Sequence, residues 1–311
     1  MTTGLTVSVV GATGLSGEIG KKGTESDLRL YHHVREGHAI TLVEPVSYPE
    51  RFSPLLQCLA LGDEAWLVAE KLDRAFAESA ATADLFSLPV RLVRGEAVGE
   101  DELRRTLRGL RFEGAEQWER DPATLRARLE SERRTAVDGP TRVRLDHAFP
   151  VKGVGTVALG FVLQGRLRAH DTLRLYPGNE KVEIRSIQVH DVDVGDAVGG
   201  ERVGVALRGI EPTAVARGAV LAAEGDLRTA RRFVVRAPRK GAYYRGTLAP
   251  GRRLQALVGA QLAPAQLVEV GGPQWIVEAD RELVYAPGDR LLLADLDVTA
   301  GPRAAAAGTV G

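Results

Sequence analysis

A glycine-rich stretch follows the first apolar run of the chain, at a place where a phosphate-binding loop could lie. The residues able to contribute are Gly11, Gly14, Lys21, Lys22 and Thr24. In a P-loop, backbone amides cradle the phosphates, a lysine reaches them and a hydroxyl holds magnesium. The spacing fails here, because Leu15 stands where the first P-loop glycine belongs and Lys22 follows Lys21 in place of Ser or Thr. A dinucleotide-binding G-x-G-x-x-G also fails, since two residues separate the first two glycines.

The other contacts expected of a guanine-nucleotide site are missing as well. The strand ending at Val93 continues as Arg94-Gly95-Glu96, without Asn-Lys-x-Asp, and Glu44-Pro45 follows Val43 without Asp-x-x-Gly. Glu44 could bind magnesium through a water, but a carboxylate there is more typical of a solvated turn residue or a cap. The stretch from Gly11 to Thr24 is therefore interpreted as a vestigial nucleotide loop. No cofactor is expected, with GTP and magnesium as the alternative.

Other catalytic constellations are no better supported. None of the six histidines forms H-x-x-x-H or H-E-x-x-H, and His32 and His33 fall on a predicted strand, where neighbours point to opposite faces. The sequence has no G-x-S-x-G motif. Its single cysteine, Cys58, lies in an apolar helical pattern, which favours a buried structural thiol. No metal site and no catalytic residue are predicted.

Composition limits the class of protein. Lys+Arg and Asp+Glu number 41 each, so only local patches can attract a charged partner. One cysteine excludes an internal disulfide framework and fits a reduced, cytosolic compartment. No signal peptide and no apolar run long enough for a membrane span are visible. We expect a cytoplasmic protein, a monomer, with neither membrane nor DNA as a partner.

The pattern of the first 138 residues predicts an α/β domain. Short apolar runs at 5–10, 39–43, 65–69 and 90–93 indicate strands, and helical spacing occupies 50–61, 72–85 and 101–110. Strands alternating with helices favour a parallel sheet. A further helix opens at Asp121-Pro122 and runs towards Arg133-Arg134, and Asp138-Gly139-Pro140 marks a boundary.

Two β-rich domains follow, at 141–223 and 227–300. Short β-branched runs separated by glycine-bearing turns are typical of small barrels or sandwiches. The first block has expected strands at 141–145, 156–162, 172–176, 182–189 and 204–207. The second has them at 232–235, 255–258, 267–270, 274–278 and 290–293. Residues 301–311 are mostly alanine and glycine and are interpreted as a loose tail.

The strongest motif is D-H-A-F-P-V-K-G-V-G-T-V-A-L-G at 146–160. It resembles the opening of the second domain of translational GTPases, above all the selenocysteine-specific elongation factors of the elongation factor Tu superfamily. The resemblance continues in order through 163–167, 170–173, 182–190 and 202–210, and Arg217-Gly218-Ala219-Val220-Leu221 is similar to the closing R-G-x-V-L. It implies a multidomain α/β plus all-β fold: a degenerate P-loop GTPase-like domain and two β-barrels, as in elongation factor Tu.

The front domain carries a weaker form of the same resemblance. The stretch G-K-K-G-T-x-S-D at 20–27 is similar to a short archaeal selenocysteine-factor-like group with a disrupted GTPase domain. In the family, the second domain holds the aminoacyl end of a charged tRNA, and Asp146, His147 and Arg202 match positions that resemble the lining of that pocket. The alternative is that these three side chains only pair with one another and with turns.

A run of cations with two aromatic residues lies in the third domain, uninterrupted by Asp or Glu. Its members are Arg228, Arg231, Arg232, Arg236, Arg239, Lys240, Tyr243, Tyr244, Arg245, Arg252 and Arg253. Clustered arginine with aromatics suits contact with RNA phosphates and stacking. The alternative is a solvated strand face whose charges pair with acids of another domain, such as Asp191 and Asp193.

The sequence therefore predicts an elongation-factor-like protein that binds aminoacyl-tRNA, the ribosome or both, without ordinary GTP hydrolysis. Two other hypotheses stay open. One is an unorthodox GTPase in which Lys21, Lys22 and Thr24 contact phosphate and magnesium. The other is a non-enzymatic adaptor whose domains present protein interfaces.

Overall fold

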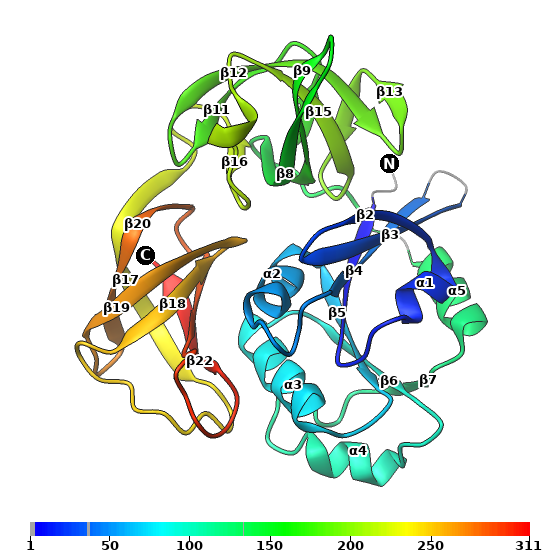
Figure 1. Cartoon of the computed structure of the whole chain (residues 1–311), viewed down its shortest axis with the longest axis vertical. Helices are drawn as coiled ribbons and strands as arrows, with labels where there is room; N and C mark the ends of the chain where they lie inside the picture. The colour runs from blue at the N-terminus through cyan, green and yellow to red at the C-terminus, as the bar shows by residue number, and fades with distance from the viewer. Residues whose placement is uncertain (1–3, 36–37, 133) are drawn as a thin grey trace.

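The computed structural model describes residues 4–35, 38–132 and 134–311 and shows three domains arranged around a common junction. In Figure 1 the α/β domain lies at the lower right, the first β domain at the top and the second at the lower left. The helices α2 (Ser53–Leu61) and α3 (Arg74–Phe86) form the side of the α/β domain that faces the second β domain.

The α/β domain contains a seven-stranded sheet in the order β2-β3-β4-β1-β5-β6-β7. The strands are β1 (Leu5–Val10), β2 (Lys21–Glu25), β3 (Leu28–Arg35), β4 (His38–Pro45), β5 (Glu64–Ala69), β6 (Val90–Arg94) and β7 (Gln117–Glu119). β4, β1, β5, β6 and β7 run parallel, whereas β2 and β3 form an antiparallel extension. The predicted parallel sheet is confirmed, and this antiparallel edge was not foreseen beyond the strand at His32-His33.

Helices cover both faces of this sheet because its central strands are buried on both sides. α1 (Leu15–Ile19) and α5 (Pro122–Ser131) pack together on one face, and α2 and α3 cover the other. α4 (Glu100–Thr106) lies below them. Proline at the first turn and the Asp121 cap, which accepts from Thr124 N–H at 2.8 Å, start α5 as predicted. The predicted continuation into Arg133 falls outside the described residues.

The middle domain closes into a ring of six antiparallel strands, because β11 pairs with both β16 and β12. The ring strands are β8 (Arg142–Val151), β9 (Gly155–Gln164), β11 (Thr172–Tyr176), β12 (Glu180–Val189), β15 (Arg202–Arg208) and β16 (Val220–Ala222). β13 (Val192–Val194) extends β12, and β10 (Arg166–Arg168) pairs with β14 (Asp196–Val198). We call this ring barrel 2. Its apolar interior includes Val143, Val182 and Ile184, all fully buried.

The last domain is a closed barrel in the strand order β17-β20-β19-β18-β21-β22. Its strands are β17 (Arg228–Lys240), β18 (Arg253–Val258), β19 (Gln261–Glu269), β20 (Gln274–Tyr285), β21 (Arg290–Ala294) and β22 (Ala304–Val310). We call it barrel 3. The interpretation of 301–311 as a loose tail is wrong: β22 pairs with β17 and β21 and closes the barrel. Its alanines are buried, where only small side chains fit.

The α/β domain and barrel 3 share one apolar core. Leu55, Leu59 and Phe76 of α2 and α3 belong to the same buried cluster as Leu292 and Ala307 of barrel 3. Cys58 lies in this cluster, fully buried, and its thiol donates to Val43 O at 3.2 Å. Burial raises the pKa of this thiol well above its ordinary value. The prediction of a structural cysteine is therefore confirmed.

Candidate functional site

The turn between β1 and α1 holds a carboxylate of the protein itself. Gly14 N–H lies 3.2 Å from both Oε1 and Oε2 of Glu44, and Ser16 N–H donates to Oε1 at 3.0 Å. Glu44, at the end of β4, is only 1% exposed. Amides at a helix N-terminus favour an anion because they lack intrahelical partners. Glu44 is therefore a buried cap on the turn that would face a phosphate; of the two roles that the sequence suggested, a solvated turn residue or a cap, the structure shows the cap.

The rest of the vestigial loop does not converge on these amides. Gly11 and Gly14 have left-handed backbone conformations, with φ of 96° and 101°, and a Cβ on Gly11 would lie 2.6 Å from Val68 O. Lys21, Lys22 and Thr24 lie beyond the opposite end of α1, on β2, whose residues are all exposed. Lys22 pairs there with Glu25. The structure thus separates the cations from the amides that the alternative GTP site would need.

The three candidates for an aminoacyl pocket divide into a pair and a single exposed residue. Arg202 Nη2 lies 3.2 Å from Asp146 Oδ2, and both side chains are 8% exposed. The guanidinium carbon of Arg202 also lies 4.7 Å from the ring centroid of Phe161. His147 is exposed and lies beside Phe149, with the ring centroids 5.6 Å apart. β8 and β15 both flank β9, which brings Asp146 and Arg202 together across that strand.

This pair lies against the α/β domain. His32 of β3 and His190 of barrel 2 meet edge to face at 5.8 Å. Burial lowers the pKa of His32 to about 4, with further lowering by the positive charge of Arg202 and by His190. Burial also lowers the pKa of His190. His33 points the other way, with Nε2 2.7 Å from Glu130 Oε1, so the predicted opposite orientation of the two neighbours is confirmed.

A second arginine of barrel 2 joins the same boundary. Arg217 donates to Asp146 O at 3.3 Å, to Gln57 Oε1 of α2 at 2.8 Å and to Ser26 Oγ at 3.0 Å. The backbone of Asp146 is therefore tied to the α/β domain, while its carboxylate is tied to Arg202. The surface that the family resemblance assigns to an acylated RNA end lies where barrel 2 meets the α/β domain.

Several members of the predicted RNA patch have internal roles. Arg239 Nη1 lies 2.5 Å from Asp84 Oδ2 of α3, and Arg252 Nη2 lies 2.7 Å from the fully buried carboxylate of Asp295. Tyr244 is 4% exposed and donates to Asp295 at 2.5 Å, so its ring is not available for stacking on a base. Tyr243, half exposed, donates to Arg108 O of the α/β domain.

The other members lie on the outside of barrel 3. They are Arg228, Arg231, Arg232, Arg236, Lys240, Arg245 and Arg253. β20 runs antiparallel to β17 and carries Glu278 opposite Arg232, at 4.0 Å, and Glu269 of β19 lies 3.7 Å from the same arginine. β17 itself contains no Asp or Glu, but the neighbouring strands place the acidic side chains of Glu269 and Glu278 beside its arginines. Asp191 and Asp193, which the sequence offered as partners, are not paired with these cations within 4 Å in the described residues.

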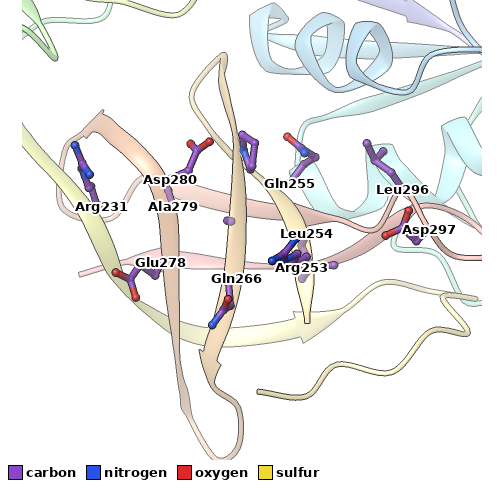
Figure 2. Close-up of a pocket in the computed structure, with 12 residues that line it drawn as sticks. Arg231, Arg253, Leu254, Gln255, Gln266, Glu278, Ala279, Asp280, Leu296 and Asp297 are labelled. Atoms are coloured by element: carbon purple, nitrogen blue, oxygen red, sulfur yellow. The ribbon is translucent and has the colours of Figure 1, made fainter. Parts of the chain in front are cut away.

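A cavity of about 630 Å³ opens on this face of barrel 3. Figure 2 shows Arg231 and Arg253 around it together with Glu278, Asp280 and Asp297. Leu254, Gln255, Gln266, Ala279 and Leu296 are the other lining residues that the figure labels. Charges of both signs line this cavity, so it lacks the uniformly positive field that the spacing of arginines in the sequence predicted.

No group of three or more His, Cys, Asp or Glu side chains is placed to hold a metal ion in the described part of the chain. Among the helices formed by residues 4–35, 38–132 and 134–311, none is long and apolar enough to cross a membrane.

Known proteins resemble this chain over most of its length. The family model for elongation factor Tu domain 2 matches residues 155–222. An uncharacterized protein of Methanocaldococcus jannaschii is 34% identical, over 94% of this chain and 95% of its own. The selenocysteine-specific elongation factor of the same organism is 25% identical, over 89% of this chain and 69% of its own. This chain belongs to the translational GTPase superfamily.

The solved structures agree with this assignment at the level of the fold. Elongation factor SelB of Methanococcus maripaludis, solved with the GTP analogue GppNHp, superposes with a TM-score of 0.81 at 22% identity, covering 99% of this chain and 78% of that one. The predicted fold, a GTPase-like α/β domain followed by two elongation-factor barrels, is confirmed. As a superfamily member, the chain is an elongation-factor-like protein related to the selenocysteine-specific branch.

Proposed function

We propose that this elongation-factor-like protein binds aminoacyl-tRNA, the ribosome or both in the cytoplasm, without ordinary GTP hydrolysis. The observation that carries the proposal is the contrast between two domains of one chain. Barrel 2 keeps the elongation factor Tu domain 2 pattern over 155–222, whereas the backbone amides at the α1 turn of the front domain donate to the carboxylate of Glu44.

The absence of triphosphate binding is argued from charge. A phosphate placed on the amides of Gly14 and Ser16 would have to displace Glu44, or share a buried site with its negative charge. Like charges at such distances repel strongly where water is excluded. The lysines that could offset this repulsion lie at the far end of α1. This geometry favours a GTP-independent factor over the GTPase that uses Lys21, Lys22 and Thr24.

The proposal for the acylated RNA end rests on Asp146 and Arg202. One related protein of Methanocaldococcus jannaschii is a selenocysteine-specific elongation factor. The buried ion pair lies beside the ring of Phe161, so charged groups and an aromatic face lie next to each other at the boundary of two domains. Such a group can hold the amino group or ester of an aminoacyl end through charge-assisted hydrogen bonds. Exposed His147 could contribute at its rim.

Nucleotide titration tests the first half of the proposal. Fluorescent GTP and GDP analogues, with and without magnesium, are added to the purified chain up to millimolar concentration. We expect no saturable, magnesium-dependent signal from the wild type or from the Lys21→Ala and Lys22→Ala variants. Saturable guanine-specific binding that these two substitutions abolish would establish the GTPase hypothesis in its place.

Protection of charged tRNA tests the second half. The ester of an aminoacyl-tRNA hydrolyses slowly in solution, and a protein that covers it slows this loss. We expect a mixture of charged tRNAs to be protected by the wild type and less by Arg202→Gln. Arg208→Gln, on the same strand but exposed and paired with Glu183 at 3.3 Å, is the matched control. Equal binding of charged and uncharged RNA, unaffected by Arg202→Gln, would favour the adaptor.

A further inference from the structure

A small cavity lies where all three domains meet. It has a volume of about 150 Å³. The α/β domain supplies mainly apolar residues, among them Leu59 and Ala60, barrel 2 supplies Arg144, and barrel 3 supplies Asp289, Arg290 and Leu292. Its walls are thus mostly apolar, and two guanidinium groups face it from different barrels. This site is separate from the α1 turn and from the Asp146–Arg202 pair.

Arg144 of β8 is poorly compensated in this cavity. Its Nη1 donates to Ala60 O at the end of α2, at 2.8 Å, whereas its buried Nε has no hydrogen-bond partner among the described residues. Burial lowers the pKa of Arg144 and outweighs the opposing effects of Asp289 and Asp63. A buried donor without a partner, on a charged group, is costly, and proteins normally satisfy it with an acceptor.

Arg290 of β21 is in a similar position. Its Nη1 donates to Leu85 O at the end of α3, at 2.9 Å. Within the described part of the chain, no carboxylate lies within 4 Å of Arg144 or Arg290. Burial lowers the pKa of Arg290, and the charges of Arg111 and Arg239 lower it further. Those two arginines already share Asp84, at 3.3 and 2.5 Å. Positive charge therefore exceeds negative charge on this side of the cavity.

One carboxylate, that of Asp289, lines the cavity, and both Asp289 and Asp63 accept a hydrogen bond from a backbone amide. Asp289 Oδ2 accepts from Ala286 N–H and Asp63 Oδ2 accepts from Thr6 N–H, each at 2.8 Å. They act on Arg144 from beyond ion-pair distance and leave its Nε unpaired. Among the described residues no acceptor reaches Arg144 Nε, and an anion bound in the cavity could supply one.

We propose that this cavity binds a small oxyanion of the size of inorganic phosphate between Arg144 and Arg290. Guanidinium groups are suited to oxyanions because their planar donors match the oxygen atoms. The volume excludes a nucleotide, since sites for ligands of that size occupy roughly 300 Å³ or more. The low-dielectric walls strengthen the attraction between the anion and the two cations. The proposal does not depend on tRNA binding.

Binding at this position has a consequence for the domains. Arg144 comes from barrel 2 and reaches α2, and Arg290 comes from barrel 3 and reaches the end of α3. An anion held by both arginines would therefore stabilise the arrangement of all three domains. A ligand that binds the assembled state alone raises its stability with concentration. The site would act as an effector site that lies away from the eroded nucleotide turn.

Thermal unfolding and calorimetry with inorganic phosphate test this proposal on the full chain. Sodium phosphate is compared with sodium chloride at equal ionic strength. We expect a saturable rise in Tm and a binding isotherm near one phosphate per chain for the wild type. Arg290→Gln should weaken binding at least about tenfold, because charge-assisted hydrogen bonds contribute about 1.5 kcal/mol or more. The matched control is Arg104→Gln, on exposed α4, which should bind as the wild type does.

Arg144→Gln could disturb folding, so Arg144→Lys is measured beside it. Lysine keeps the charge but loses the planar donor set, and we expect phosphate binding to weaken while the far-ultraviolet spectrum stays unchanged. Equal Tm shifts with phosphate and chloride would overturn the proposal and indicate an adventitious ion only. So would phosphate binding that persists in both Arg290→Gln and Arg144→Lys. Failure of tRNA protection, with phosphate binding intact, would affect only the proposed function.

Discussion

Arg239 of barrel 3 binds Asp84 of α3 with its Nη1 2.5 Å from Oδ2, although 155 residues separate them in the chain. Asp84 is fully buried, and Arg111 lies 3.3 Å from its other oxygen. A second ion pair joins Arg303 to Glu78, which lies six residues before Asp84 on α3, at 2.6 Å. The cations that the sequence assigned to RNA thus include one that holds the α/β domain against barrel 3.

Breaking this contact should destabilise the domain interface. Asp84→Asn leaves Arg239 and Arg111 without their shared charge, and since these two arginines are 43% and 40% exposed, solvent screens part of the loss, which we expect to be about 1–3 kcal/mol. We expect that loss in the free energy of unfolding, measured by urea denaturation. Glu100→Gln, which breaks the exposed pair with Arg104 on α4, should cost less than about 0.5 kcal/mol. Equal effects of the two substitutions would mean that the Asp84 contact does not hold the domains.

Substitutions of Asp146 and Arg202 should have non-additive effects on the free energy of unfolding and on the protection of aminoacyl-tRNA. A double-mutant cycle with Asp146→Asn and Arg202→Gln is expected to give a coupling energy of about 0.5–3 kcal/mol, because the two side chains touch and are 8% exposed. The cycle is measured first by urea unfolding and then by protection of aminoacyl-tRNA at temperatures where all variants are folded. Loss of stability with unchanged protection would assign the pair a scaffold role only.

Local patterns predicted much of the fold. The strand Leu5–Val10 was predicted to the residue, because it is a short apolar run that ends at a glycine. The structure buries every residue of this strand. The barrel strand Thr172–Tyr176 was likewise predicted to the residue. In contrast, β22 was missed because alanine and glycine carry little β propensity. What selects them is close packing, with Ala304 and Ala305 fully buried in the closed barrel.

The site was harder to predict because its partners are distant in the chain. Glu44 lies 30 residues from Gly14, and only the alignment of β4 beside β1 brings the carboxylate to that amide. The arginines of β17 were predicted to form a positive patch, but Glu278 comes beside Arg232 only when β20 pairs with β17. No short-range spacing carries such information. Cys58 was predicted correctly because its apolar neighbours lie on its own helix.

Removal of β22 should unfold barrel 3. A chain that ends after Gly301 would leave the edges of β17 and β21 unpaired and expose the apolar interior around Val310. We expect a loss of more than about 5 kcal/mol or aggregation, since open edges invite association. Deletion of Gly311 alone is the control. A truncated chain with an unchanged urea midpoint would contradict the view that 304–310 is an integral strand.

The salt dependence of RNA binding should report the exposed arginines of β17. If Arg228, Arg232 and Arg236 contact phosphates, replacing all three by Gln should reduce the slope of log K against log salt by about 2–3. The corresponding change at Arg104 and Arg105 of α4 is the control. Because Glu269 and Glu278 lie near Arg232, that position should contribute least. An unchanged slope would remove this face of barrel 3 from the RNA contact.

Acid should weaken the boundary between β3 and barrel 2 through His32. Its pKa is about 4 in the folded chain against an ordinary value of 6.5, so between these values the unfolded chain binds more protons. The free energy of unfolding therefore rises with pH across this window and falls as pH is lowered through it. The shift corresponds to at most roughly 3 kcal/mol, and screening of the partly exposed ring reduces this to about 1–2 kcal/mol.

Arg202 and His190 oppose protonation of the ring, and Asp191 favours it. Urea unfolding of His32→Gln between pH 4 and 6.5 should show a shallower pH dependence than the wild type, whereas His147→Gln, on the exposed side of β8, should keep the wild-type slope. Since carboxylates protonate in both backgrounds, only the difference between the slopes reports His32, and identical slopes would show that this ring titrates as in the unfolded chain.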